Sequence, residues 1–177
     1  MARRRGLTGW IARLFGRGGP VVPVVRLHGV ISAEQRPGRL SIQSVAPLLH
    51  RAFAMAGSTV AIIVNSPGGS PVQSRLISKR IRDLAREHDK HVLVFVEDAA
   101  ASGGYFIATA GDEIIADPSS VVGSIGVIFA SFGFPEALGK LGVERRVHTA
   151  GKNKSTLDPF LPETPEDVER IKQMEDR

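Results

Sequence analysis

The chain has 177 residues, a length that suits one domain of about 150 residues with a substantial core. It carries 23 Lys plus Arg and 18 Asp plus Glu, a net charge of +5, but five of the arginines and none of the acids lie in residues 1–19. Residues 20–177 are therefore neutral, which argues against nucleic acid as a partner, because a nucleic-acid-binding domain spreads its charge along one face. The absence of cysteine excludes disulfides, thiolate nucleophiles and Cys-ligated metals.

Residues 1–19 form a basic amphipathic arm. Its apolar residues have the spacing of one helical stripe, with Arg3, Arg13 and Arg17 off that stripe: Leu7, Trp10, Ile11, Leu14 and Phe15. This pattern is typical of a helix that lies in a membrane interface, and the apolar run is too short to span a bilayer. Arg13 also interrupts any secretory signal. We expect a peripheral membrane protein on the cytoplasmic face; a helix packed on a partner subunit and a soluble cytoplasmic protein are the alternatives.

After the arm, predicted strands alternate with predicted helices. Runs rich in β-branched or apolar residues predict strands at 21–30, 59–64, 91–96, 113–116, 121–129 and 143–149. Helical spacing or a cap predicts helices at 41–56, 74–87, 102–110 and 131–141, and another that begins at Thr164. This order predicts an α/β fold with a mostly parallel sheet. The last helix reaches the chain terminus without a Gly or Pro, so either it ends there or the sequence is truncated.

Two loops that follow buried strands are candidate sites, because α/β sheets place their sites there. Residues 65–70 (NSPGGS) can turn sharply and expose N–H groups that bind a phosphate or an oxyanion, although such a turn is more often only a turn. Residues 98–105 (DAAASGGY) place Ser102 where a strand meets a helix, as in the turn that presents a nucleophilic serine. The alternative is that Ser102 only caps the helix.

A nucleophilic serine needs a base, and the residues alone do not select one. None of the histidines follows a strand in a Gly- or Ser-rich loop: His28, His50, His88, His91 and His148. His148, near the end of a predicted strand, is the best of them. Lys152 and Lys154 follow it, and a lysine can act as the base if burial lowers its pKa. Lysines in loops are usually only solvated.

Four motifs in this order resemble the signal peptide peptidase A family of serine proteases: VNSPGG at 64–69; ASGGY at 101–105 with IA at 107–108 and DEI at 112–114; GSIGV at 123–127; and GKNK at 151–154. The resemblance runs from about Val24 to the C-terminus. It implies a ClpP/crotonase-like βαβ spiral that assembles into a homo-oligomeric ring, with no cofactor or metal. The expected organisation is the arm at 1–19 and a peptidase domain at 20–177, truncated at its C-terminus.

The resemblance implies a Ser–Lys dyad, with Ser102 as nucleophile and Lys154 as general base. Lys154 stands a few residues after Gly151 and before Pro159, as the family lysine does, and Lys152 ranks second. A histidine base as in ClpP is not expected, because residues 122–130 contain no His.

The same resemblance implies roles for three further residues. Gly69 and Gly103 would supply the N–H groups of the oxyanion hole, and Ser124 would orient the lysine. The expected substrates are membrane-derived peptides, such as signal-peptide remnants, and other unfolded chains. A crotonase-like acyl-CoA enzyme and a non-catalytic membrane scaffold of the same fold are the alternatives. Members of the family span the membrane near the N-terminus, whereas the arm of this chain is too short to do so.

Overall fold

The computed structural model describes residues 21–34, 36–150, 155 and 157–175. They fall into two compact units, of which the first ends at Ile125 and the second begins at Gly126. The predicted arm and both candidate bases, Lys152 and Lys154, lie outside the described residues. Each unit is described by itself.

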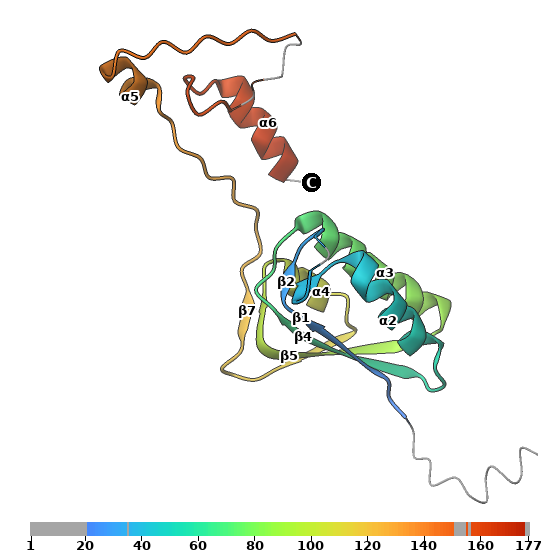
Figure 1. Cartoon of the computed structure of the whole chain (residues 1–177). Coiled ribbons are helices and arrows are strands. Elements are labelled where there is room, and N and C mark those ends of the chain that lie inside the picture. Colours follow the sequence, from blue (N-terminus) through green and yellow to red (C-terminus); the bar gives the residue numbers. More distant parts are fainter. Residues whose placement is uncertain (1–20, 35, 151–154, 156, 176–177) are drawn as a thin grey trace, which may run out of the picture. The chain divides into compact units, whose positions relative to one another are not determined.

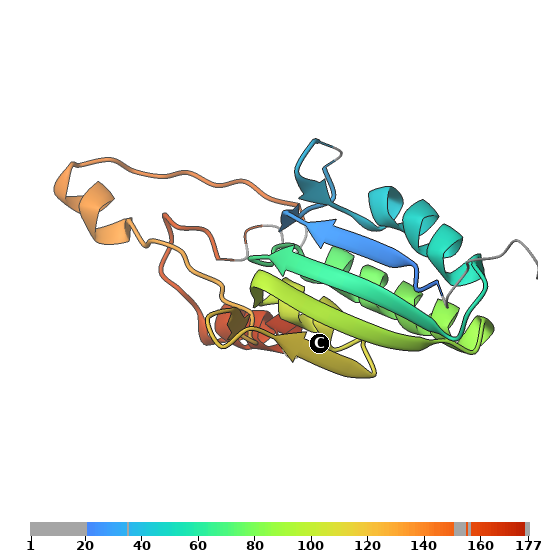
Figure 2. The ribbon, with the colours of Figure 1, turned by 90° about the horizontal axis from the view of Figure 1, so that it is seen from below.

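The first unit is built on a parallel sheet, with its helices on one face (Figures 1 and 2). The strand order is β1-β4-β5-β6, and β7 pairs with the end of β5. All pairings between these strands are parallel, which confirms the predicted α/β class with a mostly parallel sheet and flanking helices. The strands are β1 (Val24–His28), β4 (Thr59–Ser66), β5 (His91–Ala101), β6 (Glu113–Ala116) and β7 (Val121–Gly123), and a separate parallel pair is formed by β2 (Val30–Ile31) and β3 (Arg39–Leu40).

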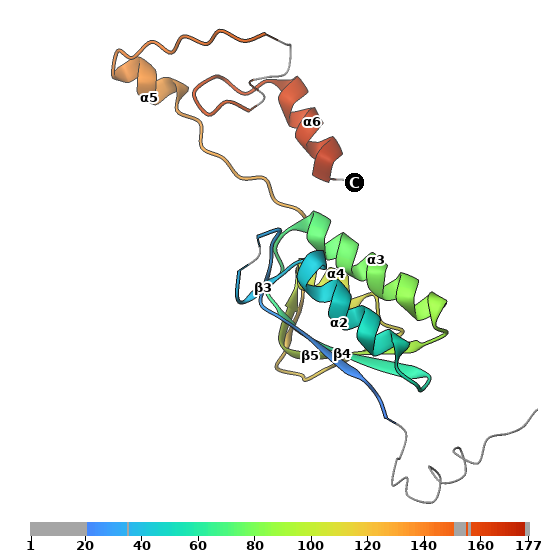
Figure 3. The same cartoon turned by 45° about the vertical axis from the view of Figure 1, so that its right-hand side comes forward.

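The helices of this unit are α2 (Ile42–Ala54), α3 (Pro71–Glu87) and α4 (Gly103–Ala108), and α2 and α3 lie side by side (Figure 3). Ser41 caps α2 by accepting a hydrogen bond from the N–H of Ser44. The helix predicted from residue 74 begins at Pro71, because Ser70 provides the cap and proline is favoured at the first helical position.

The core lies between the sheet and the helices. Leu27, Ile62 and Val94 point from neighbouring strands toward the helices and are fully or almost fully buried. Phe53 of α2 and Ile81 of α3 are fully buried against them. This packing fixes the carboxyl ends of β4 and β5, where the two candidate loops begin.

The second unit contains two helices, α5 (Pro135–Lys140) and α6 (Pro165–Glu175), joined by irregular segments. Thr164 starts α6 as predicted: its hydroxyl accepts a hydrogen bond from the N–H of Asp167 and donates one to the Asp167 carboxylate. The rings of Phe134 and Phe160 lie 5.6 Å apart, and Arg145 lies over the Phe160 ring. These contacts hold the irregular segments together.

Three predicted elements in the C-terminal part of the chain also differ from the structure. The strand predicted at 121–129 ends at Gly123, because Ser124 and Gly126 have positive φ angles that a strand does not adopt. The predicted strand at 143–149 pairs with no described strand. The helix predicted from Ser131 begins only at Pro135, since a residue that precedes proline is disfavoured in the helical conformation.

Candidate active site

Ser102 lies in a sharp turn between β5 and α4. The strand is longer than predicted and runs through Ala101, so the chain passes from strand to helix at this one residue. The backbone angles of Ser102 are φ 51° and ψ −119°, outside the regions that a residue with a side chain normally occupies. Its hydroxyl makes no hydrogen bond to the helix N-terminus. Ser102 therefore does not cap α4 through its side chain. The turn has the strained strand–serine–helix form that can present a nucleophile.

Two backbone hydrogen bonds hold Ser102 in this conformation. Its N–H donates to the carbonyl of Gly123 at 2.8 Å, and its carbonyl accepts from the N–H of Phe106 at 2.9 Å. The first bond links the turn to the end of β7, and the second is the first bond of α4. The side chain stays partly exposed, as a nucleophile must.

The Pro-Gly-Gly turn that follows β4 is held by the short strand β2. The N–H of Ile31 donates to the carbonyl of Gly68, and the carbonyl of Ile31 accepts from the N–H of Ser70, both at 2.8 Å. The buried hydroxyl of Ser66 accepts from the N–H of Gly68 at 3.1 Å. Gly68 and Gly69 have φ angles of 97° and 141°, a region open to glycine but rarely to other residues.

The structure brings the two predicted loops into direct contact. A Cβ atom at Gly68 would lie 2.8 Å from Cβ of Ser102 and 2.9 Å from the amide nitrogen of Gly103. A Cβ atom at Gly104 would lie 2.6 Å from the carbonyl oxygen of Ser66. All three distances are shorter than a carbon atom tolerates, so glycine is required at these two positions.

The two amides predicted for the oxyanion hole have no partner in the described part of the chain. Neither Gly69 nor Gly103 donates a hydrogen bond there. Ile31 bonds to Gly68 and Ser70, the residues on either side of Gly69, and leaves the Gly69 N–H free. Gly103 is the first residue of α4, a position whose N–H has no partner within the helix. Free N–H groups on two touching turns are donors that can stabilise an oxyanion.

Ser124 directly follows the carbonyl that accepts the Ser102 N–H bond. Its φ angle is 59°, and its side chain is exposed. Ser124 is thus the next residue after Gly123, whose carbonyl is hydrogen-bonded to the Ser102 turn. The distance from Ser102 to either candidate lysine is outside what the structure describes.

Sequence reasoning missed four residues that build the two turns: Gly68, Gly104, Ser66 and Asp98. The amide of Asn65 donates a hydrogen bond of 2.6 Å to the carboxylate of Asp98, which ties the ends of β4 and β5 together. Asn65 and Asp98 each stand near the end of one of two strands predicted in succession, so their contact could have been inferred from a parallel pairing. Nothing in the sequence separates the roles of neighbouring glycines.

The described histidines fit the prediction that they are structural or solvated residues. His91 lies 2.9 Å from the Glu113 carboxylate, at the start of β5 and far along that strand from Ser102. His148 is exposed in an irregular segment. Within the described residues, no group of three or more acids and histidines could hold a metal ion.

Comparison with known proteins identifies the family. The profile of peptidase family S49 matches residues 84–177, more than half of the chain. The chain belongs to this family. The predicted resemblance to the signal peptide peptidase A proteases is thereby confirmed, and the match includes Ser102, Ser124 and both candidate lysines.

Several relatives carry the same segment within longer proteins. The chain is 32% identical over 180 residues to the chloroplastic serine protease SPPA of Arabidopsis thaliana, covering 95% of this chain and 26% of that protein. It is 34% identical over 124 residues to Protease 4 of Haemophilus influenzae, covering 69% and 20%. It is 66% identical over 158 residues to a protein of Brucella melitensis named Na(+)/H(+) antiporter NhaA, covering 87% and 21%. The chain thus spans about a fifth to a quarter of these relatives, and most of the protein named as an antiporter lies outside the match.

Solved structures of proteases are also similar to the chain. The membrane-bound stomatin-specific protease 1510-N is 20% identical, with a TM-score of 0.49, over 63% of this chain and 51% of that one. ClpP1 from Listeria monocytogenes is 23% identical, with a TM-score of 0.38, over 50% and 46%.

Proposed function

We propose that this chain is the catalytic segment of a serine endopeptidase with a Ser–Lys dyad. The observation that carries the proposal is the strained backbone of Ser102, whose hydroxyl is not used to cap the helix that follows. Membership of peptidase family S49 supports the same reaction class. A crotonase-like enzyme or a scaffold would have no use for a strained serine at this point.

In the proposed mechanism, Ser102 Oγ attacks the scissile carbonyl carbon and its proton passes to the amine of Lys154. The N–H groups of Gly69 and Gly103 donate hydrogen bonds to the oxyanion of the tetrahedral intermediate. The intermediate collapses, the lysine returns the proton to the leaving amine, and water hydrolyses the acyl-enzyme. Ser124 orients the lysine, which must be uncharged to accept the proton.

The proposed substrates are membrane-derived peptides, such as remnant signal peptides, and other unfolded chains. In this proposal the arm at 1–19 holds the protein against a membrane surface, on its cytoplasmic side, and the subunits form a ring. The arginines and the Trp-containing apolar stripe of the arm support the membrane surface. Among the described residues, no helix is both long enough and apolar enough to cross a bilayer.

The dyad is tested by alanine substitution in the full-length protein. Ser102→Ala and Lys154→Ala should each lower kcat/KM for an unfolded substrate by roughly a thousandfold or more, because each removes a group that takes part in bond formation. Lys152→Ala and His148→Ala serve as matched controls and should keep their activity. If Lys154→Ala stays active while one of the controls fails, the assignment of the base is wrong.

A fluorophosphonate probe separates the proposal from its alternatives. The probe reacts with an activated serine, so mass spectrometry should find the adduct on Ser102 and none in Ser102→Ala. A full-length protein that binds acyl-CoA, or that cleaves nothing, and leaves Ser102 unlabelled would contradict the peptidase assignment.

A further inference from the structure

The backbone of Ile31 sets the direction of one proposed oxyanion donor. Its N–H donates to the carbonyl of Gly68 and its carbonyl accepts from the N–H of Ser70, so Ile31 and Gly69 pair as in a parallel sheet. The Gly68 carbonyl and the Gly69 N–H belong to one planar trans peptide group, in which they point in opposite directions. The hydrogen bond from Ile31 therefore turns the N–H of Gly69 away from β2.

The side chain of Ile31 contacts the other proposed donor residue. Ile31 is only 2% exposed, and a Cβ atom at Gly103 would lie 3.2 Å from its Cδ1. The end of this side chain therefore packs against the first residue of α4. One buried residue thus holds the Gly69 peptide group through its backbone and contacts Gly103 through its side chain.

Ser74 of α3 also contacts both turns. Its side chain is buried, and its hydroxyl donates a hydrogen bond of 2.8 Å to the carbonyl of Ser70, at the end of the Pro-Gly-Gly turn. A Cβ atom at Gly103 would lie 2.2 Å from the Ser74 oxygen. This oxygen therefore fills the space beside Gly103 that a side chain at that position would need.

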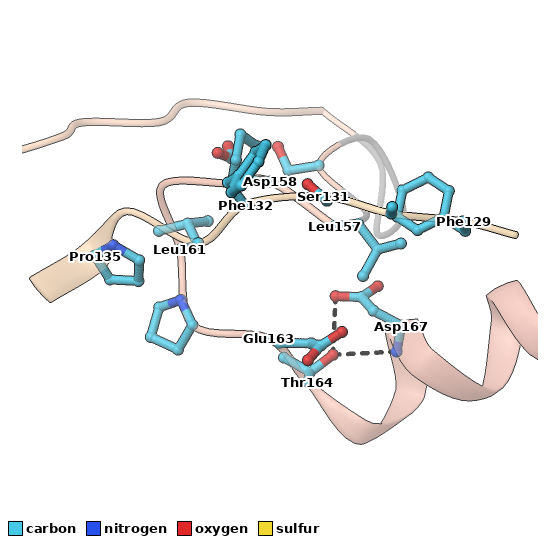
Figure 4. Close-up of a pocket in the computed structure, with 15 residues that line it drawn as sticks. Phe129, Ser131, Phe132, Pro135, Leu157, Asp158, Leu161, Glu163, Thr164 and Asp167 are labelled. Carbon is cyan, nitrogen blue, oxygen red and sulfur yellow. Dashed lines mark hydrogen bonds between the residues drawn. The ribbon is translucent and has the colours of Figure 1, made fainter.

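The hydroxyl of Ser74 is not a helix cap. A capping hydroxyl accepts from a backbone N–H in the first turn, as Thr164 does for α6 (Figure 4) and Ser70 does for α3. Ser74 instead donates to a carbonyl that its own N–H already reaches at 3.0 Å. Such a bond slightly destabilises a helix, and alanine is the better helix former. The stability of α3 therefore does not explain a buried serine here.

We propose that Ile31 and Ser74 are positioning residues that together set the direction and spacing of the Gly69 and Gly103 N–H groups. This inference rests on the proposed function, because it takes these two N–H groups as the oxyanion donors. Both positioning side chains are buried, so they act through the two glycines and not by touching the substrate. Their effect belongs to the step in which the carbonyl oxygen becomes negative, and it should appear in kcat rather than in KM.

Two small substitutions in the full-length protein test the positioning role. Ile31→Val removes the Cδ1 atom that packs on Gly103, and Ser74→Ala removes the oxygen beside it. Each should lower kcat for an unfolded substrate roughly tenfold, less than the hundredfold or more that the loss of a whole donor costs, and should change KM by less than about twofold. An unchanged kcat, or a change in KM alone, would overturn the proposal.

Two control variants match these substitutions in size and burial. Ile81→Val shortens a fully buried side chain of α3, and Ser41→Ala removes a buried hydroxyl that caps α2. Neither residue is among the nearest neighbours of Gly69 or Gly103. The controls should lower the urea midpoint about as much as their counterparts and leave kcat unchanged. If kcat falls in step with stability in all four variants, Ile31 and Ser74 have only a structural role.

Inhibition by a peptide aldehyde separates this inference from the proposed function. The oxygen of Ser102 bonds to the aldehyde carbon, the serine proton passes to the base, and the aldehyde oxygen becomes the oxyanion. Ile31→Val and Ser74→Ala should each weaken this inhibition about tenfold. In a Ser102→Ala background, where no oxyanion forms, the same substitutions should leave the binding of the corresponding substrate peptide unchanged.

The aldehyde experiment has two contrary outcomes with different meanings. If the unsubstituted full-length protein is not inhibited, the proposed function is wrong and the positioning role falls with it. If that protein is inhibited and both variants are inhibited equally well, the proposed function stands and the positioning role of Ile31 and Ser74 is refuted.

Discussion

Ser102 is held at a backbone conformation that costs about 1–3 kcal/mol in a residue with a side chain. The surrounding contacts fix this conformation: the Gly123 carbonyl accepts the Ser102 N–H, and Gly68 packs directly on the Ser102 side chain. The backbone of Ser102, and with it the direction of its Cα–Cβ bond, is therefore set by the fold.

Gly68 is the residue on which the contact between the two turns depends. Gly68→Ala should lower the free energy of unfolding by about 2–4 kcal/mol, because alanine is strained at a φ angle of 97° and its Cβ atom would overlap the Ser102 turn. It should also slow fluorophosphonate labelling of Ser102. Urea unfolding and the rate of labelling measure the two effects.

Gly38→Ala is the control for Gly68→Ala. Gly38 also has a positive φ, 76°, but a Cβ atom there would meet nothing within 4 Å. This variant should lose only about 1 kcal/mol and should label at the normal rate. Equal losses in the two variants would show that the contact between the turns contributes nothing.

At the scale of the elements, the sequence predicted the strands that lie inside the sheet, and it also predicted a strand that the structure does not form. The runs at 59–64 and 91–96 are buried on the helix face, and their composition alone identifies them. The run at 143–149 also contains β-branched residues, but it pairs with no strand among the residues that the structure describes. Strand pairing depends on two segments of the chain, so the residue pattern of one segment cannot predict whether it will pair.

The same limit applies to the candidate site. The resemblance supplied Ser102, Gly69 and Gly103, and the structure brings the turns that contain them together. The contacts of Gly68 and Gly104 follow from how closely the turns approach, which depends on the packing of β4 and β5. Only the folded chain contains that information.

Asp112 joins β5, α3 and the start of β6. Its carboxylate accepts hydrogen bonds from the N–H of Val92 at 2.7 Å and from Arg82 at 2.9 Å. The Val92 N–H, and then Arg82, hold the pKa of Asp112 below its usual value, although burial partly opposes them. Because the folded-state pKa is lowered, the carboxylate stabilises the fold above its unfolded pKa near 4, and this stability is lost as the pH falls through the folded-state pKa.

Asp112→Asn should therefore destabilise the protein by about 1–2 kcal/mol at pH 7. The difference from the unsubstituted protein should shrink as the pH is lowered below about 4, where both side chains are uncharged. Thermal unfolding across the pH range measures it. Asp89→Asn, at an exposed acid that forms no ion pair with the described residues, should stay within about 0.5 kcal/mol at every pH. A pH-independent difference for Asp112→Asn would contradict the charge-based account.

At the scale of the whole molecule, the excess of positive over negative charge is confined to one end of the sequence. The five arginines of residues 1–19 account for the whole net charge of +5. A basic residue near an anionic membrane surface contributes roughly 1 kcal/mol of binding. The arm thus has enough charge to hold a neutral domain at a membrane, with its apolar stripe adding to the binding.

Deletion of residues 1–19 should move the full-length protein from the membrane fraction to the soluble fraction. Sedimentation with vesicles containing anionic lipid should show the same loss, while vesicles of neutral lipid should bind both forms weakly. Replacing the five arginines by glutamine removes the charge and keeps the apolar stripe, so it measures the contribution of the charge to membrane binding. A deletion variant that stays fully bound to the membrane would contradict the proposed role of the arm.

The hydrogen bond from Ser102 to Gly123 has a mechanical consequence. β7 is the last described strand before the second unit begins at Gly126, and the carbonyl of its final residue, Gly123, accepts a hydrogen bond from the N–H of Ser102. Tension on the chain beyond Ile125 would therefore load this hydrogen bond together with the pairing between β5 and β7. A pulling force there would thus act on the Ser102 turn and on the end of β5 at the same time.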